Sequence, residues 1–175
     1  MKSLEKIIVG CRKNKAWAQA ELFEMFSDKM FGICLYYSSN KADAEDLLHD
    51  GFLKVFENIN KYKSDNFDAW MRKVFVNIAL MRYRKGKRMS TVEEIENVKG
   101  ITNVVFENTQ IHSDELLAMI SKLPAQYKMV FNLYAIEGYK HKEIGEMLEI
   151  SDSTSKSNLS RARKILQEQL NEYKV

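Results

Sequence analysis

Small hydroxyl side chains and cations recur near the C-terminus of this 175-residue sequence, within residues 151–164. At helical spacing, one face carries Ser153, Ser157, Ser160, Arg161 and Lys164, with Lys156 and Arg163 along one edge. Small hydroxyls let a helix sit deep in a major groove, while Lys and Arg reach phosphates or guanine edges. The alternative is an ordinary helical hairpin with a solvated basic face. The hydroxyl cluster favours a helix that binds duplex DNA.

Two helices joined by a tight turn are expected to position these side chains, over residues 138–166. In the first helix, Ile144, Met147 and Leu148 form an apolar edge, and Glu149 and Ile150 interrupt the pattern. Ser151 can cap the second helix. The residues expected to face inward on that helix are Ser155, Leu159, Ala162 and Leu166. A short helix, a sharp turn and a second helix with polar and cationic residues outward is typical of a helix-turn-helix.

A second group of cations lies between Trp70 and Ser90, where seven Lys or Arg and no acid occur. The same segment carries an apolar face at helical spacing, made of Phe67, Trp70, Met71, Val74, Ile78 and Met81. Aromatic rings interleaved with cations suit single-stranded or distorted nucleic acid. A core helix with a basic C-terminal end is the competing interpretation, and it is strongest for Phe67 and Trp70. For residues 82–88 nucleic-acid binding is the better account.

Residues 42–59 predict an amphipathic helix with acids in its first turns. The expected buried stripe is Ala44, Leu47, Leu48, Gly51, Phe52, Val55, Phe56 and Ile59. The early acids are explained by the positive end of the helix dipole. His49, Asp50 and Leu53 lie away from that stripe. They are either plain surface or a strip that docks a protein partner.

Composition limits the function classes. One proline and seven glycines among 175 residues indicate an all-α chain, and a net charge of +3 requires that any nucleic-acid binding come from local clusters. Cys11 and Cys34 are isolated, so neither a disulfide framework nor a zinc site is expected. We find no membrane-length apolar run, no signal peptide, no nucleophile–base pair and no glycine-rich phosphate loop. We therefore expect a cytoplasmic, non-enzymatic protein without cofactor, metal or small-molecule substrate.

The order of the segments predicts two small helical domains. Residues 89–112 have weak periodicity, and six acids and one Lys lie between Met89 and Leu116, which indicates a flexible acidic linker. The expected domains are therefore residues 1–88 and residues 113–175. In the second domain Ser113 can cap a helix, Pro124 separates it from the next, and the helix-turn-helix pair completes a four-helix unit.

Three segments in this order resemble the extracytoplasmic-function sigma factors, the smallest members of the sigma-70 group. The family's polymerase-docking helix is similar to DAEDLLHDGFLKVFENI. Its minus-ten segment is similar to FDAWMRKVFVNIALMRYR. Its minus-thirty-five domain is similar to LPAQYKMVFNLYAIEGYKHKEIGEMLEISDSTSKSNLSRARKIL. The resemblance runs over nearly the whole chain.

The resemblance implies a role for each group of residues. Facing the clamp of core RNA polymerase would be Asp46, His49, Asp50 and Leu53. Asp65 and Asn66 would hold a flipped minus-ten base, and Trp70, Lys73, Asn77 and Arg84 would line the strand-separating surface. Meeting the minus-thirty-five duplex would be Lys156, Ser157, Ser160, Arg161 and Lys164. The implied partners are core polymerase (clamp and flap) and promoter DNA, with an anti-sigma factor as a further candidate.

Three positions depart from the family pattern. Met81 stands where Asp is frequent, which affects polar contacts there. Glu149 replaces the usual turn glycine, so we expect a strained or altered turn. Asn158 replaces a frequent Arg, so the upstream sequence preference cannot be carried over.

The resulting hypothesis is a dissociable initiation factor whose N-terminal module holds unpaired bases and whose C-terminal module binds duplex. A stand-alone dimeric helix-turn-helix regulator and a helical protein–protein adaptor are the alternatives. The regulator would bind its operator tightly without polymerase, and the adaptor would never bind DNA. A pull-down with core polymerase, with and without promoter DNA, separates the three.

Overall fold

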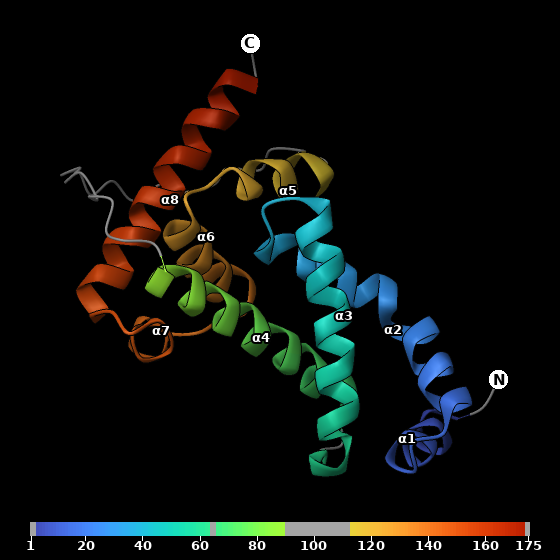
Figure 1. Ribbon diagram of the computed structural model, residues 1–175. Helices are drawn as coiled ribbons and strands as arrows, with labels where there is room; N and C mark the ends of the chain where they lie inside the picture. The colour runs from blue at the N-terminus through green and yellow to red at the C-terminus, as the bar shows by residue number, and fades with distance from the viewer. Residues whose placement is uncertain (1–2, 64–65, 90–112, 174–175) are drawn as a thin grey trace. The chain divides into compact units, whose positions relative to one another are not determined.

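The computed structural model describes residues 3–63, 66–89 and 113–173, and within these residues it is all-α, as predicted. The chain divides into two compact units, Met1–Met81 and Arg82–Val175. Figure 1 shows the helices in chain order, from α1 in blue to α8 in red. The expected linker lies almost wholly outside the described residues, so the boundaries at 88 and 113 stay predictions.

The first unit begins with two helices, α1 (Leu4–Arg12) and α2 (Ala16–Tyr37). The chain turns between them at Asn14, whose φ of 51° is left-handed. The two helices pack closely because Gly10 has no side chain. An ideal Cβ at residue 10 would lie 2.5 Å from the Cβ of Ala18.

Helix α3 (Lys41–Asn58) follows and carries the predicted buried stripe. Asn40 caps it, since its Oδ1 accepts a hydrogen bond from the Asp43 amide at 2.9 Å. A short 3₁₀ turn, η1 (Ile59–Lys61), ends the segment. Ala44, Leu47, Phe52 and Ile59 are all buried, which confirms the direction of this face.

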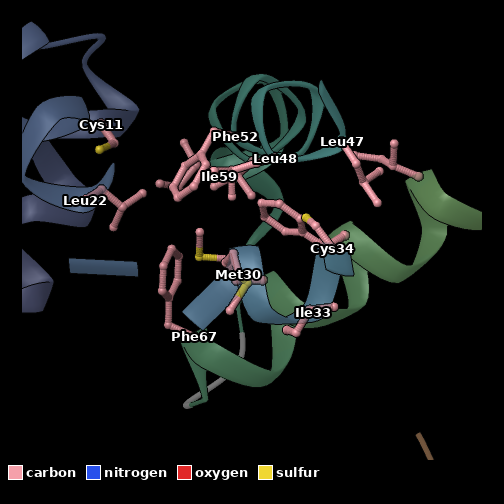
Figure 2. Packing of buried hydrophobic residues seen from close by; sticks show 14 of the residues in the cluster. Cys11, Leu22, Met30, Ile33, Cys34, Leu47, Leu48, Phe52, Ile59 and Phe67 are labelled. Atoms are coloured by element: carbon pink, nitrogen blue, oxygen red, sulfur yellow. The ribbon is translucent and has the colours of Figure 1, made fainter. Parts of the chain in front are cut away.

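Helix α4 (Phe67–Met89) supplies the remaining wall of the first core. Phe67, Met71 and Ile78 are buried, as the apolar pattern predicts. Met81 is not, because 59% of it is exposed, and its place in that face was predicted wrongly. The apolar pattern alone did not show that the buried face ends before Met81. Figure 2 shows residues from α2, α3 and α4 converging in one cluster.

After the end of α4, the second unit contains four α-helices among the described residues. They are α5 (Ser113–Ser121), α6 (Ala125–Phe131), α7 (His141–Leu148) and α8 (Asp152–Tyr173), with a π-helical turn, η2 (Asn132–Ile136), after α6. Helix α8 packs against α5, α6 and α7. Its inward residues are buried as predicted, namely Ser155, Leu159, Ala162 and Leu166.

Candidate nucleic-acid interface

The turn between α7 and α8 sets how the two helices meet. Glu149 adopts φ 57° and ψ 46°, so a residue with a side chain takes the left-handed conformation that usually favours glycine. Gly145 allows the backbone of Ile150 to pass close to α7, because a Cβ at residue 145 would lie 2.8 Å from the carbonyl oxygen of Ile150. Ser151 then caps α8 as predicted, accepting from the Thr154 amide at 3.0 Å. The result is a tight helix-turn-helix.

The outer surface of α8 carries most of the predicted duplex-binding residues. Lys156, Ser157 and Lys164 are exposed, and Ser160 is half-buried. Lys156 forms an ion pair with Asp152 at 2.9 Å, one turn earlier on the same helix. Ser157 donates a hydrogen bond to the Thr154 carbonyl at 3.0 Å. Both contacts are local and exposed, so an incoming phosphate can compete for these side chains.

The two arginines of α8 differ from the expected arrangement. Arg161 is half-buried, and its guanidinium lies 6.0 Å from the ring centroid of Tyr127 on α6. Arg163 lies 5.7 Å from the ring centroid of Tyr134, on the flank that also carries Lys156, seven residues earlier. Arg161 is therefore less exposed than its place on the outward face suggests, and its role in duplex binding stays a prediction. Sequence reasoning noted Arg163 only as an edge residue.

His141, at the start of α7, joins this flank. Its Nδ1 lies 2.9 Å from the Oγ of Ser155 on α8, and its ring stacks on Tyr134 with centroids 4.6 Å apart and an interplanar angle of 20°. Burial lowers the pKa of His141, Asp152 raises it, and Lys156 and Arg163 lower it further. Sequence reasoning missed His141 and Tyr134, since no helical period relates them to Ser155.

Asn158 faces the interior and is only 1% exposed. It belongs to the inward stripe of α8 rather than to its outer surface. Asn158 itself is therefore not part of the exposed surface of α8.

The predicted single-strand-binding residues of helix α4 differ in how exposed they are. Lys73 and Asn77, four residues apart, are exposed on one side of the helix. Trp70 is half-buried, with its ring 5.4 Å from Tyr62 and 5.4 Å from Phe67 between centroids. The core interpretation of Trp70 is thus correct in part, and one part of the ring stays accessible. Arg84 is half-buried.

The loop before α4 contributes one described residue. Asn66 is exposed, and its Oδ1 accepts a hydrogen bond from the Ala69 amide at 2.9 Å, which caps the helix. A base that hydrogen-bonds this side chain would compete with the cap. Asp65 lies outside the described residues.

Helix α3 brings its four predicted docking residues onto one surface. Asp46, His49, Asp50 and Leu53 are all exposed, and Leu53 is 62% exposed. Phe52, the residue before Leu53, contacts Phe23 of α2 with ring centroids 4.6 Å apart, and Phe23 is 38% exposed. Sequence reasoning missed Phe23, because only the packing of α2 on α3 brings it there.

The described residues hold no group of His, Cys, Asp and Glu side chains arranged to bind a metal. Burial raises the pKa of the Cys11 thiol to about 11, so it stays protonated near neutral pH. None of the described helices combines the length and apolar character that a membrane crossing needs.

Comparison with known proteins identifies both units. The family described as Sigma-70 region 2 matches residues 22–89, and the one described as Sigma-70, region 4 matches residues 113–166. The ECF RNA polymerase sigma factor SigW of Bacillus subtilis is 27% identical over 180 residues, covering 95% of this chain and 96% of SigW. The ECF RNA polymerase sigma factor SigE of Mycolicibacterium smegmatis is 28% identical over 156 residues, covering 86% of this chain and 60% of that protein.

A solved structure shares the fold. It is the sigma factor RpoE in complex with the anti-sigma factor NepR from Bartonella quintana. The TM-score is 0.53 at 20% identity, and the match covers 87% of this chain and 96% of that chain.

Proposed function

We propose that this chain, which belongs to the sigma-70 family, directs core RNA polymerase to promoters as an extracytoplasmic-function sigma factor. Its membership follows from the matches to two regions of that family, over residues 22–89 and 113–166. The single observation that carries this function is the order of the two matches along one chain. A stand-alone helix-turn-helix regulator would need only the second. The comparisons do not favour that alternative.

The α7–α8 helix-turn-helix is the proposed reader of the minus-thirty-five element. Lys156, Ser157 and Lys164 are exposed on α8, with no bulky side chain among them to hold the helix away from a groove. Arg163 and Lys156 lie on one flank and would meet phosphates there. Phosphate contacts orient the helix, and contacts to base edges select the sequence.

The exposed side of α4 is the proposed minus-ten surface. Lys73 supplies a cation for the strand backbone, and Asn77 supplies hydrogen bonds for a base edge. Trp70 offers the accessible part of its ring for stacking, while the Tyr62 and Phe67 rings hold it in place. Binding of an unpaired base offsets part of the free energy needed to open the duplex. Asn66 and Asp65, just before α4, are proposed to hold the flipped base.

The surface of Asp46, His49, Asp50 and Leu53 on α3 is the proposed contact with the polymerase clamp. An exposed Leu beside carboxylates suits a partner surface with an apolar centre and a basic rim. Phe23 of α2 would extend the apolar part of this contact.

Two DNA-binding units in one chain would bind a promoter more tightly than either unit alone. When one unit is bound, the other searches at a raised effective concentration. This mechanism involves binding alone, with no covalent step assigned to any residue. An anti-sigma factor, as found with RpoE of Bartonella quintana, would inactivate such a factor by covering these surfaces.

Reconstitution with core RNA polymerase tests the proposal. The purified chain should be retained by immobilised core and should start transcripts from some members of a promoter library randomised at both elements. Core without the chain is the control. A chain that core does not retain, or a complex that starts no transcript from the library, would refute the function.

A further inference from the structure

A chain of stacked groups connects the two helices of the helix-turn-helix. The guanidinium of Arg163 lies 5.7 Å from the centroid of the Tyr134 ring, and that ring stacks on His141 with centroids 4.6 Å apart. Nδ1 of His141 lies 2.9 Å from the Oγ of Ser155, which is fully buried. His141 is thus held in place at one ring nitrogen, so Nε2 is the nitrogen that can meet a ligand.

Charged groups of both signs surround this imidazole. From α8 it faces Asp152, Lys156 and Arg163, and Asp152 and Lys156 pair with each other at 2.9 Å. Along the chain it is flanked by Lys140, the residue before α7, and by Lys142 and Glu143. Glu143 accepts a hydrogen bond from the Lys140 amide at 2.7 Å. Tyr134 is the group that η2 contributes. Two cations, Lys156 and Arg163, and one acid, Asp152, therefore act on the ring, so an anion bound there would meet net positive charge.

We propose that His141 is a proton-dependent contact between the helix-turn-helix and a DNA phosphate, so that promoter binding strengthens as pH falls. This proposal rests on the proposed function, since it assigns regulation to the same DNA-binding surface. The neutral imidazole brings no charge to the Lys156–Arg163 flank. The imidazolium adds one cation there, held by Ser155 and by the face of Tyr134.

The direction of the pH effect follows from the thermodynamic linkage between proton binding and DNA binding. In the free protein, burial and the cations Lys156 and Arg163 lower the pKa of His141 below its ordinary value, so the ring is neutral near pH 7. A phosphate beside Nε2 favours the charged form and raises the pKa in the complex. The complex therefore binds more protons than the free protein, and proton binding and DNA binding strengthen each other. The gain grows as pH falls through the pKa of the complex and levels off below that of the free protein.

Promoter binding by the reconstituted holoenzyme tests this directly. The probe is a promoter fragment recovered from the transcription library, and its dissociation constant is measured from about pH 8 to about pH 5.5, which spans the imidazole range. We expect the affinity of the wild type to rise about threefold to tenfold over this range, the upper figure being one unit of pKa change. His141→Gln, which can still hydrogen-bond Ser155, should lack this rise. His112→Gln is the matched control and should retain it.

The salt dependence of promoter affinity provides a second readout. If His141 had a purely structural role, this salt dependence would be the same at both ends of the pH range. At the acid end, the slope of log affinity against log salt should be steeper by about 0.9 in the wild type than at the alkaline end, because one more phosphate is neutralised. His141→Gln should show one slope throughout. His141→Asn serves as a second variant, and urea unfolding checks that each variant is folded.

The outcomes are distinguishable. If wild type and both His141 variants show the same pH dependence and the same salt slopes, the proposal is overturned while the promoter function stands. If the holoenzyme binds no fragment at any pH, the proposed function fails, and this proposal fails with it.

Discussion

The ring of Phe75 on α4 lies against the backbone of Gly51 on α3. An ideal Cβ at residue 51 would stand 2.1 Å from Cε1 and 2.4 Å from Cζ of that ring. Phe75 is only 1% exposed, and it also meets Phe52 edge-on at 5.6 Å between centroids. The absence of a side chain at residue 51 therefore sets the spacing of α3 and α4. These helices carry the proposed polymerase-binding and minus-ten surfaces.

Gly51→Ala should destabilise the first unit. The added methyl group overlaps a buried ring, and such overpacking costs about 1–3 kcal/mol. Both tryptophans, Trp17 and Trp70, lie in this unit, so urea unfolding followed by tryptophan fluorescence reports on it. Gly32→Ala on α2 is the control, because a Cβ there meets nothing within 4 Å. It should raise stability by about 0.5–1 kcal/mol, and an unchanged Gly51→Ala midpoint would contradict the packing argument.

Glu149→Gly should stabilise the helix-turn-helix. A left-handed residue with a side chain costs roughly 1–2 kcal/mol, and the larger freedom of glycine in the unfolded chain returns part of that, leaving a gain of about 0.5–1 kcal/mol. Hydrogen exchange of the α8 amides measures the change locally. Glu146→Gly, an exposed position within α7, should instead lose about 1 kcal/mol. Equal losses in both variants would show that the turn carries no strain.

Leu53→Ala should weaken binding to core polymerase without weakening the fold. The side chain is 62% exposed, so its truncation removes little buried area from the free protein. At the centre of an interface the same truncation costs about 1–2 kcal/mol, a loss of roughly 5- to 30-fold in affinity. Titration of labelled core measures it. The neighbouring Lys54→Ala, whose ammonium pairs with Glu57 at 2.8 Å on the same helix, should bind as the wild type does.

Asn77→Ala should impair promoter opening more than initial docking. The side chain is exposed, and on the proposed minus-ten surface it would meet a base only after the strands separate. Permanganate footprinting of unpaired thymines measures opening, and filter binding in the cold measures docking. Asn60→Ala removes an exposed amide of the same kind from η1 and should open promoters normally. Normal melting by Asn77→Ala would count against the minus-ten assignment.

Arg163→Ala should weaken binding to the upstream duplex more than Arg161→Ala does. Each guanidinium lies over a tyrosine ring, Arg161 over Tyr127 and Arg163 over Tyr134. Tyr134 is 36% exposed, and Arg163 shares its flank with the exposed Lys156, which favours Arg163 as the DNA contact. Loss of a base or phosphate contact by Arg163 corresponds to about 1–3 kcal/mol. Loss of either arginine–tyrosine contact should lower stability by about 0.5–1 kcal/mol. Anisotropy with a labelled duplex and thermal unfolding separate the two effects, and the reverse ranking in affinity would refute this assignment.

Much of the helical architecture was predictable from the sequence. The buried stripe of α3 and the inward residues of α8 were identified correctly, because an apolar side chain every three or four residues must lie on one side of a helix. The cap at Ser151 was also predictable, since a serine before an amphipathic run satisfies the amides of the first turn. These signals are local, so they can be recognised without knowing which helix packs against the segment.

The partners of individual side chains were decided by the tertiary structure alone. The contacts of Arg161 with Tyr127, of His141 with Ser155 and of Phe23 with Phe52 each join different elements of the chain. Helical periodicity states which face is apolar, but the ring that meets a given residue depends on how far and at what angle two helices pack. The sequence therefore determined the helices and their faces, and packing determined which residues of those faces stay exposed.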